Sequence, residues 1–125
     1  MKIQESAENY IETIYIMSKK KQSIKAIDIA KELDYSKASV SVAMKNLREQ
    51  GYIVVDEAGY ISLTPTGIAI GEGLYERHVV ISQWLRLLGV PEEKAASDAC
   101  KMEHVLSKDS WQAIKRFVES HFTEK

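Results

Sequence analysis

Cysteine and long apolar runs are scarce in this sequence of 125 residues, and each scarcity argues against a class of protein. The single cysteine, Cys100, cannot form an internal disulfide, which predicts a reducing, cytoplasmic setting. No apolar run approaches the roughly 20 residues that a membrane-spanning helix needs. The N-terminal stretch MKIQESAENY has no apolar segment typical of a signal peptide. We therefore expect a cytoplasmic protein with no membrane partner.

Net charge is also low, at −1, which by itself argues against a partner as acidic as nucleic acid. The charges are unevenly distributed along the chain, however. Between Thr13 and Gln50 there are eight basic and four acidic residues, whereas from Gly51 onward there are eight basic and eleven acidic residues. This asymmetry favours a DNA-facing N-terminal half, although an ordinary solvated surface also accounts for it.

Hydrophobic spacing in the N-terminal half predicts three helices and a hairpin. Helical periodicity places the helices at residues 6–20, 26–33 and 37–50. Two short runs of β-branched and aromatic residues, 52–55 and 60–63, flank the turn sequence DEAG and predict a β-hairpin. The order helix, helix, turn, helix, hairpin is that of a winged helix-turn-helix.

The C-terminal half is predicted to be entirely helical. Thr64 can cap a long helix at 65–88, a second helix is expected at 91–106, and Ser107 can cap a third that follows. The fold class is therefore mainly α. We expect an N-terminal winged helix-turn-helix domain at residues 1–63 and an α-helical domain at residues 64–125.

The third predicted helix has the surface of a helix that enters the major groove of DNA. Its core-facing residues are expected to be Val40, Ala43, Met44 and Leu47. The outward face is small and polar, with lysines for phosphates, hydroxyls for phosphates or bases, and a valine for a thymine methyl. The predicted DNA-contacting residues are Ser36, Lys37, Ala38, Ser39, Ser41, Val42 and Lys45. The alternative is an interaction module that binds protein and never touches DNA.

The stretch DACKMEHVLS places three metal-binding residue types on one helical face, because Cys100, Glu103 and His104 stand at i, i+3 and i+4. A plainer interpretation is an inert buried cysteine beside a surface Glu–His pair near a helix end. The motif lacks the Cys-x-x-Cys spacing of structural zinc sites. A nucleophilic enzyme is the weakest interpretation, because no residue is seen that would orient His104 beside the thiol.

Further ligands must come from other helices. Glu8, Asn9 and Glu12 in the first helix, and His78 in the fourth, carry suitable donor atoms. Each also has an ordinary explanation, since Glu8 and Glu12 can form a solvated acidic face and a lone histidine is more often a core or surface residue.

Over nearly its whole length the sequence resembles the diphtheria-toxin-repressor family of metal-dependent transcriptional repressors, which includes manganese transport regulators. The segments that carry the resemblance are ENYIETIY, IDIAKELDYSKASVSVAMKNLREQGYI, LTPTGIAIG, ERHVV and DACKMEHVLS. The resemblance implies a winged-helix DNA-binding domain, a helical metal-binding and dimerisation domain, and Fe²⁺ or Mn²⁺ as corepressor. It is to the short two-domain form, so the SH3-like third domain of longer members is expected to be absent.

Carried over residue by residue, the implied metal ligands are Asn9, Glu12, His78, Cys100, Glu103 and His104. The last three match the iron-type primary site, whereas manganese-type members have a carboxylate where Cys100 stands. Asn9 stands where iron-type members have Met and manganese-type members have Asp, and its amide is a weaker ligand. Ser82 and Ala96 replace two ligands of the iron-type ancillary site, which is expected to be lost or rebuilt. Thiolate and imidazole favour Fe²⁺, with Mn²⁺ close behind.

The resemblance predicts a homodimer that binds double-stranded operator DNA with inverted half-sites. Metal binding would fix the spacing of the two recognition helices in the dimer. Apolar residues expected at the dimer interface, unless they form only the monomer's core, are Trp84, Leu85, Leu88, Trp111 and Phe117. The alternative function is a winged-helix regulator that responds to an organic ligand or to oxidation of Cys100.

Overall fold

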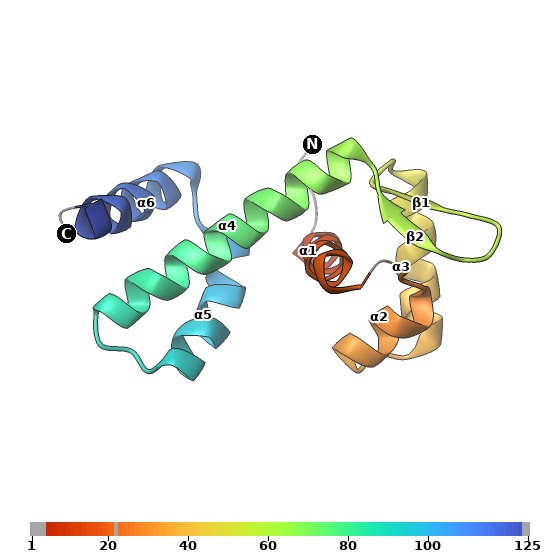
Figure 1. Ribbon diagram of the computed structural model, residues 1–125, viewed down its shortest axis with the longest axis horizontal. Coiled ribbons are helices and arrows are strands. Elements are labelled where there is room, and N and C mark those ends of the chain that lie inside the picture. The colour runs from red at the N-terminus through yellow and green to blue at the C-terminus, as the bar shows by residue number, and fades with distance from the viewer. Residues whose placement is uncertain (1–4, 22, 124–125) are drawn as a thin grey trace. The chain divides into compact units, whose positions relative to one another are not determined.

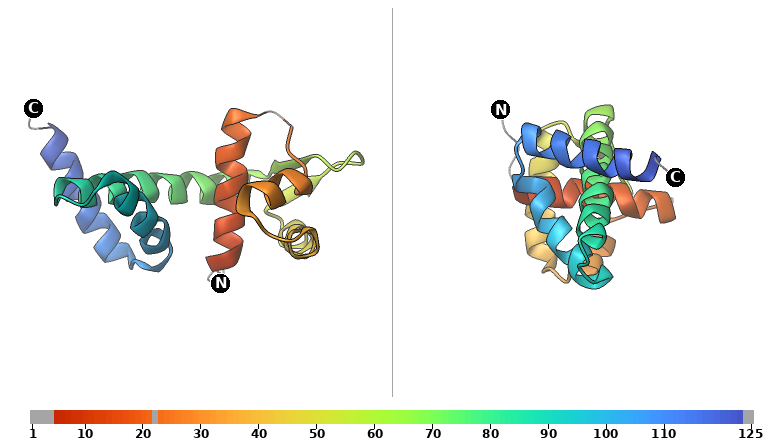
Figure 2. Two further views of the ribbon diagram at one scale, coloured as in Figure 1. Left: turned by 90° about the horizontal axis from the view of Figure 1, so that it is seen from below. Right: turned by 90° about the vertical axis from the view of Figure 1, so that its left-hand side faces the viewer.

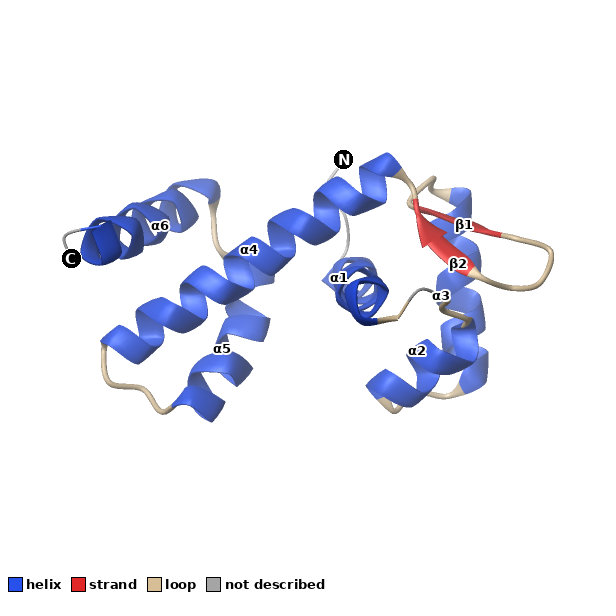
Figure 3. Cartoon of the chain, viewed as in Figure 1, coloured by secondary structure: helices blue, strands red, loops and turns tan. Residues whose placement is uncertain are grey.

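The computed structural model describes residues 5–21 and 23–123. The chain divides into two compact units, one ending at Gly73 and one beginning at Leu74, and each is described by itself. Helices dominate both units, and within the described residues the two short strands form a single sheet (Figure 3). None of the described helices is long and apolar enough to cross a membrane.

The first unit contains three helices, a hairpin and the beginning of a fourth helix (Figure 1). In chain order these are α1 (Glu5–Lys20), α2 (Ala26–Leu33), α3 (Lys37–Glu49), β1 (Ile53–Val55), β2 (Ile61–Leu63) and α4 (Pro65–Leu87). This order confirms the predicted winged helix-turn-helix, with each strand one residue shorter at its start than expected.

One apolar core holds the first unit together. Every element from α1 to β2 contributes at least one buried side chain to it, and Ile70 of α4 packs against it. The most deeply buried members are Ile11, Ile14, Ile24, Ile29, Val40, Leu47 and Ile53. Full burial of one such side chain stabilises the fold by about 1.5–3 kcal/mol, so this core fixes the orientation of α3.

Local signals set both ends of α3, as predicted. The Ser36 hydroxyl accepts a hydrogen bond from the Ser39 backbone N–H at 3.1 Å, which satisfies one of the orphan donors at the helix start. Gly51, at φ 85°, takes the left-handed conformation that ends the helix. Asp34 takes the same conformation after α2, at φ 57°. The turn at Asp34 therefore sets where α3 begins relative to α2, and the turn at Gly51 sets where α3 ends.

The hairpin is the wing of this unit. Its antiparallel register pairs Val54 with Ser62. The backbone N–H of Ile61 donates to the carbonyl oxygen of Ile24 at 2.7 Å, and the Thr64 hydroxyl donates to the carbonyl oxygen of Gly51 at 2.7 Å. Its tip extends away from the helices of the unit (Figure 2).

Two glycines let the start of α4 approach its neighbours. A Cβ atom on Gly67 would overlap the carbonyl oxygen of Tyr52, and one on Gly71 would lie 2.7 Å from Cβ of Tyr15. Only glycine permits such close helix packing without displacing a neighbour. These contacts hold α4 against the base of the hairpin and against α1.

The second unit consists of the rest of α4, α5 (Glu92–Val105) and α6 (Lys108–Thr123). Helix α4 ends at Leu87, one residue before the predicted end, and Gly89 has φ 101°. The Ser107 hydroxyl caps α6, as predicted, by accepting from the Ser110 N–H at 3.1 Å. The three helices share a core of Ile81, Ala99 and Trp111, flanked by Val80, Leu85, Met102 and Leu106.

The five residues predicted for the dimer interface are in different environments. Trp111 is 6% exposed and belongs to the core of its own unit, against which Leu85 also packs. These two residues therefore contribute to the core of their own unit, and their role at a dimer interface stays a prediction. Leu88 and Phe117 are 61% and 52% exposed, and Trp84 is half-buried. These three remain the predicted dimer residues with accessible apolar surface.

Candidate metal centre and DNA-binding face

The residues of α3 that are exposed in the structure include those that the sequence predicted to face outward. Val40, Met44 and Leu47 are buried, whereas Ala43 is half-buried. The seven residues predicted to contact DNA, Ser36, Lys37, Ala38, Ser39, Ser41, Val42 and Lys45, are all exposed. Val42 is 61% exposed although valine is apolar, so its methyl groups are accessible to a binding partner.

Asp28, in the first turn of α2, forms an ion pair and a backbone hydrogen bond with two nearby lysines. Its carboxylate accepts from the Lys25 backbone N–H at 2.9 Å and from the Lys21 ammonium at 3.3 Å. The Lys25 hydrogen bond is the main cause that lowers the pKa of Asp28, and the Lys21 and Lys31 charges add to it, against a smaller opposing effect of burial. Asp28 is therefore a carboxylate that helps to start α2 and partly balances the local lysines.

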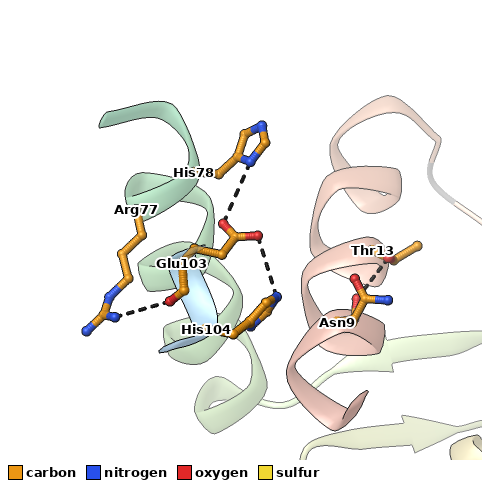
Figure 4. Close-up of polar contacts among 6 residues, drawn as sticks. All are labelled: Asn9, Thr13, Arg77, His78, Glu103 and His104. Carbon is orange, nitrogen blue, oxygen red and sulfur yellow. Dashed lines mark hydrogen bonds and ion pairs between the residues drawn. The ribbon is translucent and has the colours of Figure 1, made fainter. Parts of the chain in front are cut away.

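Glu103 of α5 is the centre of the candidate metal site (Figure 4). Its side chain is 0% exposed. Nδ1 of His78, on α4, lies 3.8 Å from Oε2 of Glu103, and Nε2 of His104 lies 3.6 Å from Oε1. The His104 side chain is 3% exposed and that of His78 is 29% exposed. Packing of α5 on α4 thus brings His78 to the helix that carries the other two residues.

This donor set fits a divalent metal ion. Ligand atoms on one ion, each about 2.0–2.2 Å from it, lie about 3–4 Å apart. Each imidazole nitrogen lies at such a distance from one Glu103 oxygen, and the two imidazoles approach different oxygens of that carboxylate. A carboxylate and imidazoles are ligands for Fe²⁺, Mn²⁺ and Zn²⁺ alike. A buried carboxylate is also costly to keep ionised unless a cation or strong donors stand beside it.

For the other predicted ligands, Cys100, Glu12 and Asn9, the structure gives the exposure of each residue and one hydrogen bond. Cys100, one turn before His104 on α5, is exposed. Glu12 of α1 is 5% exposed, and the half-buried Asn9 accepts a hydrogen bond at its backbone oxygen from the Thr13 hydroxyl at 2.8 Å (Figure 4). Their role as ligands stays a prediction.

Arg77, which the sequence analysis did not single out, also contacts the candidate metal site. Its Nη1 donates to the backbone oxygen of Glu103 at 3.1 Å and to that of Leu106 at 3.4 Å. The available signal was its position next to His78 in ERHVV. An arginine in a helix is usually a surface charge, however, and only packing reveals this contact.

Two protein-family descriptions together match almost the whole chain. Residues 2–61 match "Iron dependent repressor, N-terminal DNA binding domain". Residues 64–124 match "Iron dependent repressor, metal binding and dimerisation domain". The outward face of α3 lies within the match to the DNA-binding domain. His78, Glu103 and His104 lie within the match to the metal-binding and dimerisation domain.

Curated relatives with high similarity carry the name HTH-type transcriptional regulator MntR. That of Geobacillus kaustophilus (strain HTA426) is 40% identical over 111 residues, which cover 89% of this chain and 77% of the relative. That of Lysinibacillus sphaericus (strain C3-41) is 35% identical over 114 residues, which cover 91% and 80%.

Solved structures show the same fold. The metal-dependent transcriptional regulator MtsR matches with a TM-score of 0.82 and 26% identity over 90% of this chain. A manganese-dependent transcriptional repressor in complex with manganese matches with a TM-score of 0.83 at 21% identity, which supports the fold alone. The chain spans about half of their length, 53% and 52%. From the family matches and the curated relatives, the chain belongs to the iron-dependent repressor family of metal-dependent, DNA-binding transcriptional regulators, and it is not an enzyme.

Proposed function

We propose that this chain acts in the cytoplasm as a homodimeric repressor whose Fe²⁺- or Mn²⁺-bound form binds an operator with two inverted half-sites. Family membership supports DNA binding, dimerisation and metal dependence. The half-site arrangement is our extension, because a two-fold symmetric dimer presents two recognition helices related by the same symmetry.

The exposed face of α3 supports DNA recognition through its side-chain chemistry. Lys37 and Lys45 supply charge for phosphates, and Ser41 supplies a hydroxyl for a phosphate or a base. Ala38 permits close approach, and Val42 offers a methyl contact to thymine. The wing contributes less in this proposal, because its exposed tip carries Asp56 and Glu57, which phosphates repel.

The single observation that carries the metal part of the proposal is the fully buried Glu103 carboxylate with an imidazole nitrogen near each oxygen. His78, Glu103 and His104 would hold the ion, and Glu12, Asn9 and Cys100 are the further ligands that we predict. The bound ion supplies positive charge that neutralises the buried carboxylate and joins residues from separate helices. In its absence, these helices lose that shared restraint.

The coupling to DNA that we propose depends on where the predicted ligands lie in the sequence. Asn9 and Glu12 belong to α1, in the unit that carries α3, whereas the remaining predicted ligands belong to the second unit. Shared ligation would favour one placement of α3 in the dimer by differential binding to that state. The two recognition helices would then match the spacing of the half-sites.

The donor set also bears on which metal is used. One carboxylate and two imidazoles accept both Fe²⁺ and Mn²⁺, and a thiolate from Cys100 would favour Fe²⁺. We propose Fe²⁺ as the corepressor, with Mn²⁺ as the alternative.

The exposure of Cys100 favours a second candidate, in which oxidation of the thiol changes DNA binding. Metal sensing and oxidation sensing are distinguished by measuring operator binding of the metal-loaded protein before and after mild peroxide treatment. Loss of binding in wild type but not in Cys100→Ser would support oxidation sensing, and equal binding throughout would exclude it.

Operator architecture provides the test of the proposed function. A duplex is first selected from a random library with metal-loaded protein, and the selected sequence is expected to contain two inverted half-sites. Inserting about 5 base pairs, half a helical turn, between them should abolish tight binding, whereas about 10 base pairs should restore part of it. Binding that ignores the insertion would contradict the dimeric arrangement.

A further inference from the structure

Arg77 connects three helices of the second unit through one guanidinium group. Its Nη1 donates to the backbone oxygens of Glu103 and Leu106, at 3.1 and 3.4 Å. The same guanidinium lies 5.4 Å from the ring centroid of Trp111, which is 6% exposed in α6. Arg77 itself is on α4 and is half-buried. A half-buried arginine with contacts to two further helices is not a solvated surface charge.

The backbone groups that Arg77 contacts are at the C-terminal end of α5. Helix α5 ends at Val105 and Leu106 is its C-cap residue, so the carbonyls of Glu103 and Leu106 are at the end of the helix, where the supply of helical N–H donors stops. The C-terminal end of a helix carries partial negative charge, and a guanidinium there is attracted to it. Arg77 thereby satisfies two carbonyls and fixes the last turn of α5.

Two consecutive residues of α4 thus contact the same residue of α5. His78 approaches the side-chain carboxylate of Glu103, with Nδ1 3.8 Å from Oε2, while Arg77 binds the backbone oxygen of Glu103 (Figure 4). The position of a side chain follows from the position of its backbone. A group that fixes the Glu103 backbone therefore also limits where its carboxylate and the neighbouring His104 can lie.

We propose that Arg77 is a positioning residue for the metal centre: it holds the last turn of α5 so that Glu103 and His104 present their donor atoms together with His78. This inference rests on the proposed function. Supporting residues of metal sites commonly change metal affinity by about 10- to 100-fold when lost. We expect Arg77 to have an effect of that size without contacting the ion.

Arginine and lysine should differ at this position. The planar guanidinium presents several N–H donors at fixed angles, which permits simultaneous contacts to two carbonyls. A lysine retains the positive charge but not this geometry. Arg77→Lys is thus expected to have an intermediate metal affinity, and Arg77→Met, which keeps much of the apolar stem, the lowest.

Lys115 offers a matched control. Its ammonium lies 5.9 Å from the Trp111 ring centroid and 3.1 Å from the Glu76 carboxylate. Lys115→Met therefore removes a cation near the same aromatic ring and a contact to α4. It leaves the hydrogen bonds of Arg77 to the end of α5 in place, because Lys115 contacts Trp111 of α6 and Glu76 of α4.

The test is a titration of the metal-free full chain with Co²⁺, followed by the visible absorption of the bound ion. This absorption depends on the number and arrangement of ligands, so it reports site geometry and not overall stability. Wild type, Arg77→Met, Arg77→Lys, Lys115→Met and His104→Ala are compared, with far-UV circular dichroism to confirm folding. Arg77→Met should bind about 10-fold more weakly with an altered spectrum. Arg77→Lys should be intermediate, and Lys115→Met should match wild type.

Each other outcome overturns a defined claim. Wild-type affinity and spectrum in both Arg77 variants would overturn the positioning role and leave the proposed function standing. Equal losses of metal affinity in Arg77→Met and Lys115→Met would assign the effect to packing around Trp111. That result would also overturn the positioning role of Arg77. If Arg77→Met does not fold, Arg77→Lys alone decides. If wild type does not bind Co²⁺, or if His104→Ala binds Co²⁺ with the same affinity and spectrum as wild type, the proposed metal site is overturned instead.

Discussion

Nδ1 of His78 lies 3.8 Å from Oε2 of Glu103, although the two residues come from different helices. Glu103 is fully buried, so α4 and α5 enclose an ionisable side chain in addition to the apolar core that they share with α6. Burying a carboxylate has a free-energy cost that apolar residues of similar size would avoid. We attribute its presence to metal binding, and the predictions below test this account and the fold that supports it.

The exposed thiol of Cys100 should report on metal binding. In metal-free protein we expect rapid reaction with an alkylating reagent, because the side chain is accessible. If the thiolate is a ligand, saturating Fe²⁺ or Co²⁺ should slow alkylation at least 10-fold, an order-of-magnitude expectation for a coordinated thiolate. The measurement is the rate of mass increase by mass spectrometry. Equal rates with and without metal would remove Cys100 from the ligand set, while leaving Glu103, His78 and His104 in place.

Lys45 on α3 is predicted to contact a DNA phosphate. Lys45→Ala should weaken binding to all duplexes similarly and reduce the slope of log affinity against log salt by about 1, because one fewer counterion is released. The measurement is fluorescence anisotropy of a labelled duplex at several salt concentrations. Lys94→Ala, at an exposed position of α5, is the control with the same charge change. An unchanged slope for Lys45→Ala would exclude this phosphate contact.

Two glycines of α4 should respond oppositely to substitution by alanine. Gly67→Ala should destabilise the protein by about 1–3 kcal/mol, because its Cβ would overlap the carbonyl oxygen of Tyr52. A Cβ on Gly73 meets no described atom within 4 Å, so Gly73→Ala should stabilise by up to about 1 kcal/mol through helix propensity. Urea unfolding of the metal-free protein measures both values. Equal stability of the two variants would contradict the close approach of α4 to the hairpin base.

Asp28 should contribute stability that depends on pH. Its folded-state pKa is lowered from the ordinary value of 3.8, chiefly by the Lys25 N–H, so the ionised form is favoured by folding. The contribution is fully present above that value and is lost as the pH falls through the lowered folded-state pKa. Asp28→Asn should therefore be less stable than wild type at neutral pH, with a difference that shrinks under acid conditions. Thermal unfolding between pH 7 and 3 measures this, with Asp98→Asn as an exposed control. A constant difference across that range would contradict it.

Local structure was predictable from the sequence wherever a few neighbouring residues determine it. The Ser36 cap, the Gly51 stop and the turn around DEAG depend on short-range backbone chemistry, and all were predicted at the right positions. The exposed and buried faces of α3 followed from helical periodicity for the same reason.

Contacts between helices were less predictable. The motif around Glu103 suggested a metal site, and His78 was a further candidate ligand, but no local pattern shows that α4 packs beside that carboxylate. Trp111 and Phe117 illustrate the same limit, since both were predicted as apolar interface residues although one is buried and the other is 52% exposed. Arg77 was missed because its partners are backbone oxygens of another helix, which the identities of the neighbouring residues do not reveal.

The central claim is that metal bound at Glu103 controls DNA binding. We would measure binding to the library-selected duplex in a mobility-shift assay, with chelator, with Fe²⁺ under anaerobic conditions and with Mn²⁺, for wild type, Glu103→Gln and the exposed control Glu93→Gln. We predict tight, specific binding only with metal for wild type and Glu93→Gln, and a much higher metal requirement for Glu103→Gln at unchanged helicity, because glutamine is similar in shape but lacks the charge. Tight specific binding in chelator, or a Glu103→Gln variant that responds to metal like wild type, would contradict the account.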